Sequence, residues 1–168
     1  MKTLMSTIKR LLFSPGAINS LMGFGLIIAA YLFEVIGNFE PCPLCILQRW
    51  SFGLIGICGI ILLVLPIQGL IQKLILFLAG IFALGGGTIA ARQIYLQHLP
   101  KDQIPSCAPP MDFLMDTLPF LEVIQTILLG DGNCAETQWR FIFNFAEWAL
   151  LAFIGLVAYN LYFIFIKR

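Results

Sequence analysis

Five cysteines are the residues of this 168-residue chain whose chemistry stands out first. Two of them, Cys42 and Cys45, flank Pro43 and Leu44 in a Cys-Pro-Leu-Cys sequence, which has the spacing of thiol–disulfide redox motifs. A disulfide that closes so small a ring removes little chain entropy, so it makes a poor structural cross-link. The spacing therefore predicts a reactive pair that exchanges disulfides.

The residues around this pair favour a reactive thiolate on one of its two sulfurs. Pro43 is typical of the first turn of a helix, where no backbone N–H is needed. Cys45 then lies near the positive end of the helix dipole, which stabilises a thiolate. Arg49 follows four residues later on the same helix face, where its charge can reach that sulfur.

Arg49 and Gln48 are candidate functional residues at the edge of an apolar helix. An arginine inside such a helix is costly, and it therefore marks a functional position by default. The alternative is an arginine that extends to the membrane surface. Beside Cys42 and Cys45, we favour the functional interpretation. Gln48 either donates a hydrogen bond in this site or packs between helices.

The remaining cysteines are Cys107 and Cys134, which have 26 residues between them, and Cys58, which we expect to be an inert core or lipid-facing residue. In an oxidising compartment the four cysteines other than Cys58 predict two disulfides. A bridge between Cys107 and Cys134 would close a long loop and stabilise it by roughly 3 kcal/mol. Spacing alone favours this structural interpretation, although the exposed Pro-Ser-Cys-Ala-Pro-Pro setting of Cys107 suits attack by another protein's thiol.

Composition shows which elements must position these cysteines. The chain is 60% hydrophobic and 11% charged, and so short a chain has no soluble core that could hide this excess. Apolar stretches long enough to cross a bilayer must be helical, because lipid offers the backbone no hydrogen bonds. We predict one all-α transmembrane domain over residues 1–168, a four-helix bundle with helices at about 14–35, 44–65, 72–95 and 144–166.

Charge predicts the orientation of these helices. Six basic residues fall on one side of a four-helix topology, which the positive-inside rule assigns to the cytoplasm together with both termini; they are Lys2, Lys9, Arg10, Lys73, Lys167 and Arg168. Two periplasmic loops, at about 36–43 and 96–143, then carry the cysteine pairs. Within the second, residues 113–129 predict an interfacial amphipathic helix interrupted at Pro119, or a loop that covers the helix ends. The chain has no basic stripe, which excludes a nucleic-acid ligand.

Three segments of the chain together resemble the DsbB family, the quinone-dependent thiol oxidases of the bacterial inner membrane. They are Pro-Cys-Pro-Leu-Cys-Ile-Leu-Gln-Arg at 41–49, the cysteine at 107, and Gly-Asp-Gly-Asn-Cys-Ala-Glu-Thr-Gln-Trp at 130–139. The resemblance spans nearly the whole chain, and it includes the four helices with two cysteine pairs in two outer loops.

The resemblance implies a relay of electrons. A DsbA-like periplasmic thiol oxidase, in its reduced form, would attack Cys107, and the Cys107–Cys134 pair would end up reduced. The electrons would pass to Cys42–Cys45, and Cys45 would reduce a quinone (ubiquinone or menaquinone) from the membrane pool. Arg49 would lie near the quinone head. Because DsbA is itself a strong oxidant, another ordinary disulfide would be a poor final acceptor, and the quinone supplies the driving force.

Other interpretations remain open at this stage. A paralogue of the same family would keep the chemistry and serve a dedicated partner. A non-catalytic membrane protein would hold two static disulfides, or bind zinc through four converging thiolates. The single histidine, His98, favours a surface role over a metal site, so we predict no metal. Arg92, near the outer end of the third helix, could contact the quinone, Glu147 or lipid headgroups.

Overall fold

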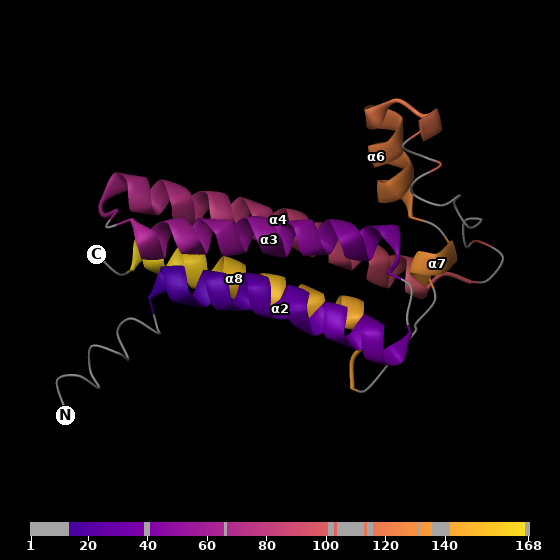
Figure 1. Ribbon diagram of the computed structural model, residues 1–168, viewed down its shortest axis with the longest axis horizontal. Coiled ribbons are helices and arrows are strands. Elements are labelled where there is room, and N and C mark those ends of the chain that lie inside the picture. Colours follow the sequence, from indigo (N-terminus) through magenta and orange to yellow (C-terminus); the bar gives the residue numbers. More distant parts are fainter. Residues whose placement is uncertain are drawn as a thin grey trace.

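The computed structural model describes residues 14–38, 41–65, 67–100, 103, 113, 116–130, 132–135 and 142–166. Its main body is a bundle of four long helices, each long and apolar enough to cross a membrane (Figure 1). They are α2 (Pro15–Gly37), α3 (Pro43–Val64), α4 (Leu70–Gln97) and α8 (Phe145–Phe165). The predicted fold class, an all-α membrane protein with four transmembrane helices, is confirmed.

Two shorter helices, α6 (Phe120–Leu129) and α7 (Gly132–Ala135), lie together at one end of the bundle. We call this the loop end. Residues 116 and 117 are helical and α6 begins at Phe120, so Pro119 interrupts the helix as predicted. In Figure 1, α6 runs across the direction of the four long helices. Its position in the membrane interface stays a prediction.

Local sequence signals begin and end the long helices. The Ser14 hydroxyl accepts a hydrogen bond from the Ala17 N–H at 3.2 Å, and it thereby caps α2. Asn38, with a φ of 54°, ends that helix in the left-handed conformation. Asn144 and Glu147 form a reciprocal capping box at the start of α8, with hydrogen bonds of 2.8 and 2.9 Å.

Small residues let the long helices approach closely. A Cβ at Gly23 would lie 2.6 Å from the Phe52 carbonyl oxygen, so this glycine allows backbone contact between α2 and α3. A Cβ at Gly86 would lie 2.2 Å from the Phe153 ring. Gly86 thus lets α4 pack closely against α8. Phe153 in turn stacks on Phe52 with the ring centroids 4.0 Å apart, which joins α3 to α8 in the core.

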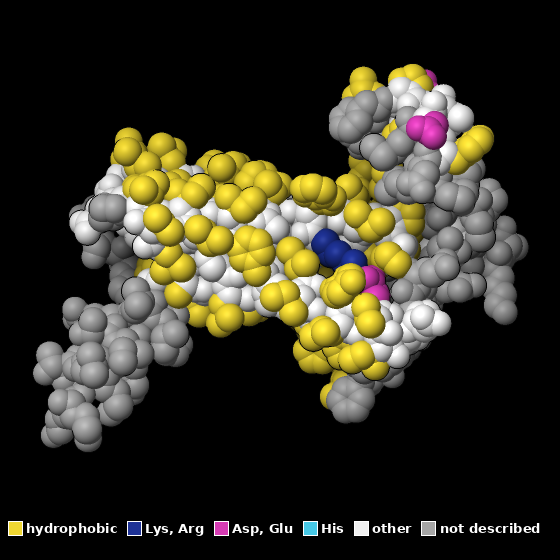
Figure 2. All heavy atoms as spheres, viewed as in Figure 1, with side chains coloured by type: hydrophobic (Ala, Val, Ile, Leu, Met, Phe, Trp, Pro, Cys, Tyr) yellow, Lys and Arg dark blue, Asp and Glu magenta, His cyan; other side chains and the backbone are white. Residues whose placement is uncertain are grey.

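The outer surface of the bundle is mostly apolar. In Figure 2, hydrophobic side chains spread over the long helices. Exposed examples occur on all four of these helices, as with Ile28, Ile57, Phe77 and Ile154. Such a surface suits contact with lipid and would be costly in water.

Two buried asparagines join α2 to α8 at the end of the bundle away from the loop end. Asn19 and Asn160 are both fully buried, and their amides exchange hydrogen bonds of 2.8 and 3.2 Å. Asn160 also donates to the Leu156 carbonyl at 2.8 Å. These contacts pair the amides where neither water nor lipid would do so.

We predict that replacing either asparagine alone with leucine destabilises the bundle by about 1–3 kcal/mol, because the partner amide is left buried with a lost hydrogen bond. The double variant Asn19→Leu/Asn160→Leu should lose less than the sum of the two single variants. Thermal unfolding in detergent measures both effects. Strict additivity of the three variants would show that the pair does not act as a unit.

Candidate active site

The Cys-Pro-Leu-Cys sequence lies at the loop end, where α3 begins. Cys42 is the N-cap residue and Pro43 occupies the first turn, as predicted. The backbone N–H of Cys45 donates to the Cys42 sulfur at 3.3 Å, so a sulfur takes the place that a serine or aspartate oxygen usually holds. The two Sγ atoms lie 2.8 Å apart. Cys42 is buried and Cys45 is half-buried, so the two sulfurs have different surroundings.

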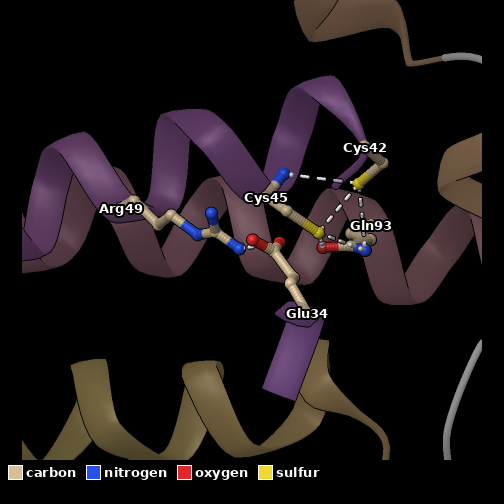
Figure 3. Close-up of polar contacts among 5 residues, drawn as sticks. All are labelled: Glu34, Cys42, Cys45, Arg49 and Gln93. Atoms are coloured by element: carbon tan, nitrogen blue, oxygen red, sulfur yellow. Dashed lines mark hydrogen bonds and ion pairs between the residues drawn. The ribbon is translucent and has the colours of Figure 1, made fainter. Parts of the chain in front are cut away.

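An amide from α4 lies against both sulfurs. Gln93, which is 4% exposed, places its Nε2 atom 3.3 Å from the Cys45 Sγ and 3.5 Å from the Cys42 Sγ. Figure 3 shows the Gln93 amide beside the two sulfurs. Sequence reasoning missed Gln93. The available signal was a glutamine within a long apolar helix, since a buried amide needs a hydrogen-bond partner.

Gln48 is buried on α3 and contacts this same amide. Its Nε2 atom donates to the Gln93 Oε1 atom at 2.7 Å. Gln48 therefore packs between helices, and its hydrogen bond joins α3 to α4. Its predicted role in binding a ligand stays a prediction. The Gln93 NH₂ group is the end of the amide that lies nearer to the sulfurs, whereas the Gln93 oxygen accepts from Gln48 and also from the Cys45 thiol, at 3.7 Å.

Arg49 forms an ion pair with Glu34, which α2 contributes near its end. The two side chains are 24% and 18% exposed. In Figure 3 the Glu34 carboxylate lies between Arg49 and Cys45. Figure 2 shows basic and acidic side chains meeting on the apolar face of the bundle. The sequence alone did not pair Glu34 with Arg49, because the two residues belong to different helices.

Cys134 brings a third sulfur to this place from the second loop. It is fully buried on α7, in one hydrophobic cluster with Cys42, Leu44 and Leu96. Gly130, with a φ of 76°, precedes α7, and a Cβ there would lie 2.3 Å from the Leu96 side chain. A glycine therefore lets the loop pass close to α4. Cys107, the predicted partner of Cys134, lies outside the described residues.

The pKa of the Cys42 thiol is raised above its ordinary value. The main cause is a hydrogen bond with the Cys134 side chain, followed by the hydrogen bond with Cys45 and by burial. A thiol with a raised pKa stays protonated at neutral pH and can donate to a neighbouring sulfur. Cys42 accordingly serves as the hydrogen-bond donor to Cys45.

The structure also places three other residues considered from the sequence. The Arg92 guanidinium stands over the Tyr95 ring, 5.3 Å from its centroid. The exposed His98 ring contacts the Ile94 carbonyl at 2.8 Å through Nδ1. Cys58 is buried within α3. Among the residues that the structure describes, no group of three or more histidine, cysteine or acidic side chains could hold a metal ion.

Comparison with known proteins gives one consistent result. The family model for the disulfide bond formation protein DsbB matches residues 15–163. Disulfide bond formation protein B of Hahella chejuensis is 38% identical over 143 residues, which cover 84% of each chain. Disulfide bond formation protein B 1 of Pseudomonas aeruginosa is 43% identical over 140 residues, covering 79% of this chain and 82% of that protein. No solved structure matches the chain.

The family match runs from the first residue of α2 to near the end of α8, and it includes both segments that carry the cysteines. They agree with the all-helical membrane fold and with the Cys-Pro-Leu-Cys sequence at the start of α3. The chain therefore belongs to the DsbB family, and it is a multi-pass membrane protein of disulfide bond formation.

Proposed function

We propose that the protein is a membrane thiol oxidase that reoxidises a DsbA-like dithiol oxidase and passes the electrons through two cysteine pairs to a membrane quinone. One observation carries this proposal: Cys134, from the second loop, lies buried against Cys42, while Cys45 lies on the side of Arg49. The three sulfurs thus form a path from a loop to the lipid-facing surface of the bundle.

The proposed path begins with the Cys107–Cys134 disulfide. A thiolate of the reduced partner bonds to Cys107, and Cys134 leaves as a thiolate. The partner's second thiolate then closes the partner's own disulfide and releases Cys107. The partner has lost two electrons and two protons, and the loop pair has gained them.

The second exchange moves these electrons to the pair at α3. The Cys134 thiolate attacks Cys42 of the Cys42–Cys45 disulfide, and Cys45 leaves as a thiolate. Cys107 then attacks Cys134, restores the loop disulfide and releases Cys42, which takes up a proton. Cys134 is buried in one cluster with Cys42 and contacts its side chain. This contact supports attack on Cys42 as the first step of the exchange. Hydrogen bonds from Cys42 and Gln93 favour negative charge on the Cys45 sulfur.

The surface beside Cys45 suits a quinone. Phe33 and Trp50, the chain neighbours of Glu34 and Arg49, are 45% and 68% exposed and offer apolar contacts. The Arg49 guanidinium is partly exposed and can donate to a carbonyl oxygen that gains negative charge. When bound, a quinone supplies a two-electron acceptor that leaves as the quinol with two protons. Cys45 and Arg49 would hold its head, and Glu34 orients the guanidinium.

The orientation in the membrane is part of this proposal. The loop end faces the periplasm of a bacterial inner membrane, and both termini face the cytoplasm. Lys73 supports this orientation, because it lies near the start of α4, at the opposite end of the bundle from the cysteines. A periplasmic loop end gives a soluble partner access to Cys107 and gives the quinone access to Cys45 from lipid.

We predict that Cys45→Ser abolishes quinone reduction driven by a reduced DsbA-like protein, because the hydroxyl cannot take part in a disulfide. Cys58→Ser, in the same helix but away from the site, should retain turnover. Quinol formation by the purified variants in detergent measures both. Full turnover without the Cys45 sulfur would exclude the mechanism.

The contact between Cys134 and Cys42 predicts a specific trapped disulfide. In the variant Cys45→Ser/Cys107→Ser, mild oxidation should join Cys42 to Cys134, and mass spectrometry of the digested protein should detect the bridged peptides. The matched variant Cys42→Ser/Cys107→Ser, which keeps Cys45, should form far less of a bridge to Cys134. Equal yields from both variants would contradict the proposed order of exchange.

Two arginines near the loop end provide a matched test of the quinone site. Arg49→Met should lower kcat/KM for quinone about a hundredfold, the usual order for losing a donor to a developing oxyanion. Arg92→Met should have a much smaller effect, because the Arg92 guanidinium stands over the Tyr95 ring. Steady-state kinetics with varied quinone distinguishes the two. Equal losses in both variants would indicate a general effect of surface charge.

A further inference from the structure

Two buried glutamines form a directed chain of hydrogen bonds that ends on the sulfurs. Gln48 on α3 donates to the Gln93 oxygen at 2.7 Å. The Gln93 nitrogen then lies 3.3 Å from the Cys45 sulfur and 3.5 Å from the Cys42 sulfur. The Gln93 oxygen is farther away, 3.7 Å from the Cys45 sulfur, and accepts from its thiol. The two side chains are 5% and 4% exposed, so surrounding water cannot take over either contact.

The direction of these hydrogen bonds matters chemically because an amide has two unlike ends. Its NH₂ group donates hydrogen bonds and stabilises a thiolate, whereas its oxygen only accepts and would repel one. Rotation of the Gln93 amide by half a turn would place the oxygen where the NH₂ group now contacts both sulfurs. In the observed arrangement the NH₂ group of Gln48 donates to the oxygen of Gln93. This hydrogen bond would be lost on rotation, so it disfavours the rotated amide.

We propose that Gln48 is a positioning residue that holds the Gln93 NH₂ group against the sulfurs and thereby makes the Cys42–Cys45 pair a stronger oxidant. Stabilising the reduced form of a cysteine pair raises its reduction potential. A stronger oxidant accepts electrons from Cys107 and Cys134 more readily. This inference rests on the proposed function, in which Cys42–Cys45 receives electrons from the loop pair.

The test measures the reduction potential of Cys42–Cys45 in the full-length chain that also carries Cys107→Ser and Cys134→Ser. In the titration, dithiothreitol gives two electrons and two protons to the Cys42–Cys45 disulfide and becomes its own cyclic disulfide. Gln93→Met, of similar length and without an amide, should shift this equilibrium about tenfold toward the Cys42–Cys45 disulfide. This shift equals about 30 mV for a two-electron couple.

The Gln48 variants test whether Gln48 acts through Gln93. Gln48→Met should also lower the reduction potential of Cys42–Cys45, because the Gln93 amide is then able to rotate. The double variant Gln48→Met/Gln93→Met should match Gln93→Met alone, since Gln48 has nothing left to position. The double variant also leaves neither amide buried without its partner, so it provides a measurement if a single variant fails to fold. Gln48→Asn, which retracts the amide by one methylene, should resemble Gln48→Met.

A third glutamine provides the matched control. Gln97 lies one helical turn beyond Gln93 on α4 and accepts a hydrogen bond from Asn144 at 2.8 Å. Gln97→Met removes the same kind of side chain from the same helix, and it should leave the potential of Cys42–Cys45 unchanged. A shift as large as that of Gln93→Met would show that the potential follows helix packing, and it would overturn the inference.

Two further results would overturn the role assigned to Gln48. One is an unchanged potential in Gln48→Met beside a lowered one in Gln93→Met. The other is a double variant whose shift equals the sum of the two single shifts. Neither result bears on quinone reduction itself, which the Cys45→Ser assay tests separately. The proposed thiol oxidase would then stand while the positioning role of Gln48 fails.

Discussion

The contact between the Gln93 amide and two cysteine sulfurs is the interaction on which this site depends. It requires α4 to lie close to the first turn of α3, and it requires a partner for the amide oxygen, which Gln48 supplies. In a lipid environment every buried polar group needs such a partner within the protein. The same requirement accounts for the ion pair of Arg49 with Glu34 and for the paired asparagines at the other end of the bundle.

The remainder of the bundle holds these groups in register. Gly86 admits the Phe153 ring against α4, and Phe153 stacks on Phe52 of α3. The two helices that carry Gln93 and the Cys-Pro-Leu-Cys sequence are thus packed through a shared aromatic contact in the core. Because protein interiors are close-packed, a larger residue at position 86 would displace one of these helices. The geometry of the sulfurs therefore depends on packing several turns away.

The fold was more predictable from the sequence than the site. Four apolar stretches bounded by charges and turn residues determine four membrane helices, because lipid permits little else. Pro43 likewise predicted where α3 begins, since that property is local. Gln93 and Glu34 carry no local signal of their partners, which belong to other helices and depend on how those helices rotate. The meeting of Cys134 with Cys42 depends on the path of a long loop, which periodicity does not encode.

The surroundings of the two sulfurs at α3 differ in a way that gives the proposed relay a direction. Cys42 is buried, faces Cys134 and has a raised pKa, so it is best suited to stay protonated once it has been released as a thiol. Cys45 receives hydrogen bonds from Cys42 and Gln93 and is half-buried. Negative charge that forms in the exchange is therefore stabilised on Cys45, the less buried of the two sulfurs. A symmetric pair would lack this preference, because either sulfur could leave equally well.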